Sequence, residues 1–189
     1  MKFDDFDKRM RVYEQSIDQY IVPGLYIVAR LDGRSFTKLT REICRFEAPF
    51  DQRFRDLMVN TTKHIMNCGF KVLYGYTESD EISLLFSPNN SAFANKVRKI
   101  NTILAGEASG YFSLALGKVV SFDCRVVPLP NAALVKDYFL SLRYSFSQPY
   151  AISRKIKPEA CPLHFSGKHH KDKKLPMSFA NFIRCFDIC

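Results

Sequence analysis

The chain has 189 residues, of which 47% are apolar, and it carries a formal net charge of +9 at neutral pH. It has no apolar run near the ~20 residues that cross a membrane, its acidic start is unlike a signal peptide, and its six cysteines form no CxxC pair. These features argue against a membrane protein and against a disulfide-stapled secreted module. We expect a soluble, cytoplasmic protein with one core domain.

The predicted elements begin with an amphipathic helix, because apolar residues recur at alternating spacings of three and four. They are Phe3, Phe6, Met10, Tyr13 and Ile17. After a Pro-Gly turn, the apolar run over 25–31 predicts a central strand that is buried on both faces. This strand leads into Asp-Gly-Arg-Ser-Phe over 32–36.

A second helix is expected to begin at Asp51, as its N-cap, and to end near Gly69. Two short β-forming runs follow, over 71–76 and 82–86, and the five residues Thr-Glu-Ser-Asp-Glu between them include three acids. That pattern predicts a β-hairpin with an acidic tip. Carboxylates at this density repel one another, and oxygen ligands suit Mg²⁺, so the tip is a candidate metal site.

A long helix over about 93–117, a strand over 119–127 and a helix over 131–142 complete the periodic part of the chain. Two glycines inside the long helix, Gly106 and Gly110, predict close packing against another backbone. In total, the elements follow the order β-α-β-β-α-β after the first helix.

From residue 143 onward the pattern degrades into scattered prolines and a basic run. We therefore divide the chain into an ordered domain over 1–142, which includes the N-terminal helix, and a poorly packed basic tail over 143–189. At most a short helix near 179–186 is expected there. The tail's cysteines and histidines fit no standard zinc spacing, and its basic run is typical of a solvated surface as well as of an RNA contact.

The element order predicts an α+β fold of the ferredoxin-like type, an antiparallel sheet with two helices on one face. In this topology the first strand lies beside the strand that follows the acidic tip. Asp32, at the end of the first strand, would then face Asp80 at the tip across a few ångströms. Either motif alone is typical of an ordinary turn. Together, on this topology, they favour a functional site.

Two aspartates on adjacent strand ends can bridge two Mg²⁺ ions, which position a nucleoside triphosphate and lower the pKa of an attacking hydroxyl. Gly33 lacks a Cβ, so its carbonyl could approach metal and phosphate closely. Further donors around the triphosphate would come from Arg34, Ser35 and Thr37.

Five segments follow one another in the order Arg30–Phe36, Pro49–Asp51, Tyr76–Ser83, Phe122–Arg125 and Asp137–Phe139. Together they resemble the tRNA-His guanylyltransferase family, including its 3′–5′ polymerase relatives. The resemblance covers roughly residues 3–139. It implies a polymerase-type palm, a homotetramer, and a nucleotidyltransferase that adds a nucleotide to the 5′ end of a tRNA. In this family the 5′-monophosphate is activated with ATP, or the end carries a triphosphate, and the 3′-hydroxyl of the incoming GTP then attacks it.

The resemblance also assigns roles. Asp32 and Asp80 would be catalytic and, with the carbonyl of Gly33, would hold the two Mg²⁺ ions. The nucleotide would be held by Asp32, Gly33, Arg34, Ser35, Phe36, Thr37, Ser79 and Asp80. Lys99 and Arg125 are candidates for phosphate contacts.

The chain departs from the family at two places. Ala48 stands where relatives place a basic residue, and the resemblance stops after Phe139, inside a helix. A divergent C-terminus would explain this, but the aperiodic tail favours a shifted reading frame or an alternative end. Two other functions therefore stay open: a catalytically impaired relative that still binds GTP or tRNA, and another palm-fold enzyme that uses GTP, such as a nucleotide cyclase.

Overall fold

The computed structural model describes residues 3–48, 51–144 and 150–153. Its elements are α1 (Phe3–Gln15), β1 (Tyr26–Gly33), α2 (Phe36–Lys38), the π-helical turn η1 (Leu39–Ile43), α3 (Gln52–Ile65), β2 (Val72–Glu78), β3 (Glu81–Phe86), the 3-10 turn η2 (Ala92–Asn95), α4 (Val97–Leu116), β4 (Phe122–Leu129), α5 (Ala132–Tyr144) and β5 (Tyr150–Ser153).

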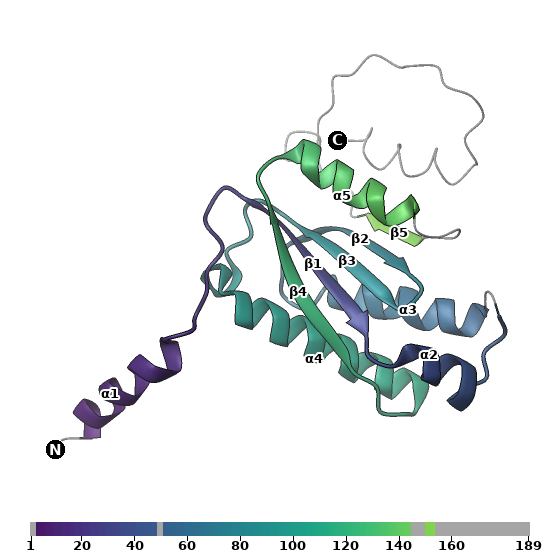
Figure 1. Ribbon diagram of the computed structural model, residues 1–189, viewed down its shortest axis with the longest axis horizontal. Coiled ribbons are helices and arrows are strands. Elements are labelled where there is room, and N and C mark those ends of the chain that lie inside the picture. Colours follow the sequence, from purple (N-terminus) through teal and green to yellow (C-terminus); the bar gives the residue numbers. More distant parts are fainter. Residues whose placement is uncertain (1–2, 49–50, 145–149, 154–189) are drawn as a thin grey trace, which may run out of the picture.

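The strands form one antiparallel sheet in the order β4-β1-β3-β2-β5. Helices α3 and α4 cover one face of this sheet, and α5 lies on the other (Figure 1). The arrangement of β1 to β4 with α3 and α4 confirms the predicted ferredoxin-like α+β fold. The fifth strand was not predicted. It pairs with β2, although it falls in the range assigned to the tail. The remainder of the predicted tail, including its proposed short helix and zinc-type residues, lies outside the described residues.

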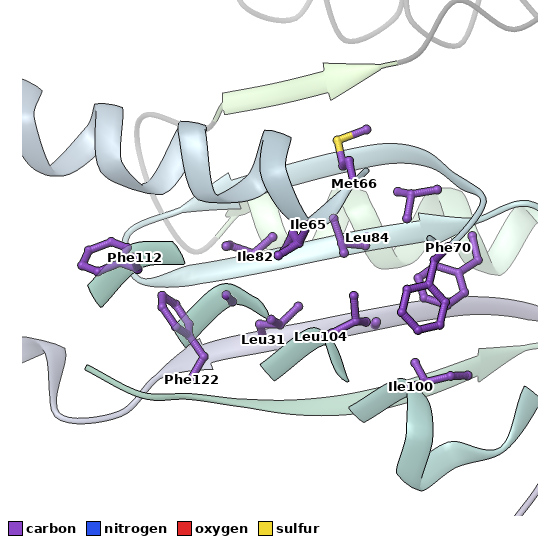
Figure 2. Close-up of a cluster of buried hydrophobic side chains, with 14 of the residues drawn as sticks. Leu31, Ile65, Met66, Phe70, Ile82, Leu84, Ile100, Leu104, Phe112 and Phe122 are labelled. Atoms are coloured by element: carbon purple, nitrogen blue, oxygen red, sulfur yellow. The ribbon is translucent and has the colours of Figure 1, made fainter. Parts of the chain in front are cut away.

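Strand β1 is buried on both faces, as its continuous apolar run predicts. Ala29 and Leu31 are fully buried on the side of α3 and α4, and Val28 is fully buried on the side of α5. Figure 2 shows the larger cluster, in which Leu31 lies among side chains from both helices, including Ile65 and Leu104. Full burial of one such side chain stabilises the fold by roughly 1.5–3 kcal/mol, so β1 is fixed firmly in the centre of the sheet.

Helix α4 begins later than predicted, at Val97 instead of near residue 93. Phe93 and Ala94 have left-handed backbone angles, with φ of 55° and 52°, which cannot continue a right-handed helix. The predicted close packing at Gly106 and Gly110 is not found within the described part of the chain, where a Cβ built at either position meets nothing within 4 Å.

Strand β4 begins at Phe122, three residues later than the pattern indicated, because Val119 lies in the preceding loop and is 97% exposed.

No helix in the described ranges is long and apolar enough to cross a membrane. Helix α1 forms where it was predicted, but it buries none of its residues and projects away from the body of the molecule (Figure 1).

Candidate active site

The end of β1 lies against the acidic hairpin tip. Asp32 is directly opposite Glu81 in the β1–β3 register. One residue further along, the amide of Gly33 donates a hydrogen bond to the carbonyl of Asp80, with an N–O distance of 3.1 Å. The fold thus brings together Asp32 and Asp80, the two aspartates singled out in the sequence, at the ends of neighbouring strands. We call this end of the sheet the acidic edge.

Two further carboxylates lie at this edge. Asp123 on β4 is the register partner of Asp32 on its other side, as Glu81 is on β3. Burial raises the pKa of Asp32, the negative charges of Asp80, Glu81 and Asp123 raise it further, and only Arg30 opposes them. Because like charges outnumber the neighbouring cation, the edge favours a bound positive ion. Sequence reasoning gave Asp123 no role. The alternation of apolar and charged residues over 122–125 was the available signal.

The glutamates that flank the tip already have partners. Glu81 forms an ion pair with the guanidinium of Arg30 on β1, and the hydroxyl of Tyr76 donates a hydrogen bond of 2.6 Å to the carboxylate of Glu78. Both contacts fix the ends of the two hairpin strands. Asp80, in the turn between them, is therefore better placed than either glutamate to receive a cation.

The donor set suits a metal that also binds substrate. In the described part of the chain, no group of three or more His, Cys, Asp or Glu side chains gathers closely enough to hold a metal ion by itself. The predicted set of Asp32, Asp80 and the Gly33 carbonyl contains only two such side chains. Mg²⁺ commonly binds through one or two carboxylates and completes its shell with phosphate oxygens and water.

The structure gives a packing reason for glycine at position 33, in addition to the predicted approach of its carbonyl to a metal, which stays a prediction. A Cβ at this position would lie 2.5 Å from the ring of Phe36, which is only 2% exposed and cannot move aside freely. The absence of a side chain therefore lets Phe36 pack beneath the strand end.

Two residues around the site have strained backbone conformations, and one backbone amide is already engaged in a hydrogen bond. Ser35 and Ser79 have left-handed φ values of 61° and 51°, which are costly for residues other than glycine. The amide of Arg34 donates to the carbonyl of Ser121 at 2.9 Å, so it is not available to a triphosphate. Among the predicted donors, Arg34 is left with its side chain, while the amides of Ser35 and Thr37 lie at the start of α2.

A cavity of about 380 Å³ opens beside the hairpin tip. Four of the predicted nucleotide-binding residues line it, namely Phe36, Thr37, Ser79 and Asp80. The other lining residues are Thr40, Arg41, Phe46, Glu47, Ala48, Asp51 and Phe54. Aromatic walls with polar groups at the rim are typical of a pocket for a planar heterocycle. Sequence reasoning assigned most of these other lining residues no role in a site, because η1 and the loop before α3 have no hydrophobic periodicity.

Asp51 caps α3 as predicted, accepting a hydrogen bond of 2.8 Å from the amide of Arg53. Hydrogen bonds from the Arg53 side chain hold the pKa of Asp51 well below its usual range, so this carboxylate stays charged and paired. Arg41 is then the one basic side chain among the described residues lining the cavity.

Of the two candidate phosphate contacts, only Arg125 lies near this edge, where it is directly opposite Arg30. Lys99 is in the first turn of α4, whereas Phe112, near the other end of that helix, packs on Phe122 beside Gly33. Thirteen residues of helix span about 20 Å, so Lys99 is not brought to the site.

Comparison with known proteins agrees with this geometry. A family model described as tRNAHis guanylyltransferase matches residues 7–130. A tRNA(His) guanylyltransferase of Debaryomyces hansenii is 27% identical over 133 residues, which cover 65% of this chain and 50% of that protein. An uncharacterized protein of Acanthamoeba polyphaga mimivirus is 36% identical over 116 residues, covering 56% of this chain and 38% of that protein.

Among solved structures, a bacterial tRNA(His) guanylyltransferase-like protein in complex with GTP superposes with a TM-score of 0.68 at 25% identity. The match covers 75% of this chain and 66% of that one. The chain spans about half the length of the curated relatives it matches.

Proposed function

This chain belongs to the tRNA-His guanylyltransferase family, and we propose that it is a nucleotidyltransferase that adds a guanine nucleotide to the 5′ end of a tRNA. The observation that carries the proposal is the hydrogen bond between the Gly33 amide and the Asp80 carbonyl. It ties the two strand ends together next to a cavity lined by Asp80 and Phe36. Asp80 lines this cavity, and Asp32 lies at the adjacent strand end without lining it, which supports a nucleotide site at this position.

Asp32, Asp80 and the carbonyl of Gly33 would hold two Mg²⁺ ions. The residues fit such ions, because the pKa of Asp32 is raised by burial and by neighbouring carboxylates that a cation would neutralise. When bound, the ions would lower the pKa of the attacking hydroxyl of GTP and position its phosphates. Only the deprotonated carboxylate of Asp32 binds a cation, and its pKa is raised, so protons should compete with metal at this edge as the pH falls.

The cavity would orient the nucleotide. The rings of Phe36 and Phe54 line its apolar side, and Thr37 and Ser79 supply hydroxyl groups. Ala48, where relatives have a basic residue, also lines the cavity, and Arg41 would supply the positive charge that is missing at Ala48. A bound nucleotide would displace water from Asp80 and hold its reacting hydroxyl near the acidic edge.

The family supplies three further parts of the proposal: ATP as the activating nucleotide, a tRNA 5′ end as the acceptor, and a homotetramer. They concern the whole protein of the relatives, of which this chain spans about half. The competing proposal is a relative that binds GTP and tRNA but adds nucleotides poorly, since the resemblance ends within α5.

A single assay tests substrate and direction together. The full chain is incubated with a 5′-truncated tRNA, labelled GTP, ATP and Mg²⁺, and the RNA is analysed for added label. Asp80→Ala should lower addition on the order of 1,000-fold, because metal positioning is worth several kcal/mol and 1.36 kcal/mol is tenfold in rate. Asp56→Ala, an exposed carboxylate on α3, serves as the matched control and should retain the wild-type rate.

Three results would contradict the proposal. Full activity in the Asp80 variant would remove the site assignment. A cyclic nucleotide formed from GTP without RNA would identify a cyclase instead. Tight GTP and tRNA binding with no addition by the wild-type chain would establish the binding-only relative.

A further inference from the structure

The turn that carries Asp80 is very short. Strands β2 and β3 are joined by Ser79 and Asp80 alone, because Glu78 and Glu81 are partners in the register of the hairpin. A turn of this length follows the positions of the strand ends that it connects. The groups that hold the two glutamates therefore also determine where the Asp80 carboxylate lies.

The first glutamate is held by a side chain on which α5 packs. The Tyr76 hydroxyl donates a hydrogen bond of 2.6 Å to the carboxylate of Glu78. The ring of Tyr76 contacts the ring of Phe139 on α5, at a centroid distance of 6.3 Å. Phe139 is fully buried in the core cluster between α5 and the sheet. Helix α5 thus fixes the place from which Tyr76 reaches the hairpin tip.

The second glutamate is connected to α5 through the residue before Phe139. Arg30 on β1 forms an ion pair with Glu81, and Tyr138 interacts with the same guanidinium. Burial lowers the pKa of Arg30, but the contacts with Glu81 and with Tyr138 outweigh it and raise the pKa. The Tyr138 ring packs edge-on against Phe139 at a centroid distance of 5.5 Å. Both ends of the turn are therefore reached from neighbouring residues of one helix.

Two polar atoms at the contact between α5 and β1 are buried without a hydrogen bond. Within the described part of the chain, neither the Tyr138 hydroxyl oxygen nor Nε of Arg30 has a partner. Burial of such groups is costly unless they are satisfied. A guanidinium can only donate and a tyrosine oxygen can accept, so each can satisfy the other. A phenylalanine would fill the same space against Phe139, so the hydroxyl is explained by its contact with Arg30 and not by packing.

We propose that Tyr138 is a positioning residue for the acidic edge. Its hydroxyl accepts a hydrogen bond from Arg30 and orients the guanidinium that holds Glu81, so that Asp80 stays in place to receive a cation. The inference rests on the proposed function, because it concerns the same metal site. It gives α5, the helix within which the family resemblance ends, a part in metal binding without contact to the metal.

Binding of Mn²⁺, which suits the same oxygen ligands as Mg²⁺, tests the proposal without RNA or turnover. The ion alone is titrated into the full chain, since GTP would bind it too, and free Mn²⁺ is measured by electron paramagnetic resonance. Changing a group that orients a metal ligand commonly costs ~10–100-fold in affinity. Tyr138→Phe acts at a greater remove and should cost about tenfold, with a melting temperature near that of the wild type because the ring packing is retained.

Two further variants control this experiment. Tyr111→Phe is the matched control, because Tyr111 is also half-buried on a helix, but on α4, where it stacks on His64 on the opposite face of the sheet (Figure 1). It should bind Mn²⁺ like the wild type. Arg30→Gln tests the route. In that background Tyr138→Phe should cause no further loss, since the hydroxyl has no guanidinium left to orient.

The dependence of nucleotide addition on Mg²⁺ separates positioning from a structural role. At low Mg²⁺, Tyr138→Phe should lower kcat, and about tenfold more Mg²⁺ should restore it, with KM for GTP unchanged. A variant that was impaired because it is partly unfolded would not be rescued by the ion.

Three outcomes would overturn the inference. If Asp80→Ala abolishes Mn²⁺ binding while Tyr138→Phe leaves it unchanged, the hydroxyl has no positioning role, although the proposed metal site stands. If Tyr138→Phe and Arg30→Gln weaken binding additively, the hydroxyl does not act through Arg30. A wild-type chain that binds no Mn²⁺ would refute the metal site itself, and the inference with it.

Discussion

Two neighbouring regions contribute to the stability of the fold with opposite signs. They are the aromatic cluster around Phe36, which stabilises it, and the acidic edge around Asp32, which destabilises it. In the cluster, the Phe36 ring packs against Phe112 and Phe122 with centroid distances of 5.2 and 5.0 Å. At the edge, carboxylates repel one another and Ser79 is held in a left-handed conformation. The cluster keeps the edge in a geometry that it would not maintain alone. Substitutions in the two regions should therefore change stability with opposite signs.

The largest effect is expected at the centre of the cluster. Phe36→Ala should lower the free energy of unfolding by about 3–5 kcal/mol, because it leaves a cavity beneath the strand end. Denaturant unfolding would measure it. Phe93→Ala, at a ring that is 50% exposed, should cost much less. Equal losses in the two variants would mean that the cluster does not support the edge.

The contact between the two regions is tested at Gly33. Gly33→Ala should cost about 1–3 kcal/mol of unfolding free energy, because the new Cβ collides with the Phe36 ring. In the double variant Gly33→Ala/Phe36→Leu, the glycine substitution should cost clearly less, since the shorter side chain leaves room. Strictly additive losses in a double-mutant cycle would contradict this origin of the requirement for glycine.

At the edge, a loss of function should accompany a gain in stability. Asp32→Asn removes a charge that its neighbours oppose, so at neutral pH and without metal it should raise the unfolding free energy by about 0.5–1 kcal/mol. Folding raises the pKa of Asp32. The wild type therefore gains stability relative to the variant as pH falls through that raised value, and the difference should vanish in acid.

Thermal unfolding across pH, with Asp56→Asn as control, measures the difference. The same variant should lose Mg²⁺-dependent GTP binding. Destabilisation by Asp32→Asn at neutral pH would show that the edge is not under electrostatic strain.

A gain no larger than the one expected at Asp32 should come from a glycine-to-alanine substitution at a position with open space around the new methyl group. Gly106→Ala lies inside α4 with open space around the new methyl group. It should stabilise the protein by about 0.5–1 kcal/mol through helix propensity, measured by the same denaturant titration. A loss at Gly106 comparable to that at Gly33 would show that steric room does not separate the two positions.

The sequence predicted the elements whose residues follow a clear period, and the topology then placed Asp32 near the tip. Other parts could not be predicted for identifiable reasons. The η1 wall of the cavity has no period, so Thr40 and Arg41 gave no signal. The left-handed angles at Phe93 and Ala94 interrupt a pattern that otherwise reads as helix. For α1 the pattern was correct, but apolar spacing alone does not say whether a helix is buried, and no residue of α1 is buried.

Strand β4 is an outermost strand of the described sheet, and its composition bears on whether strands of another molecule can pair with it. Sheet edges with unpaired backbone groups invite further strands and so lead to aggregation. Along β4, Asp123 and Arg125 are exposed charges, and Pro128 has no amide to offer an incoming strand. These residues discourage polymerisation by sheet extension.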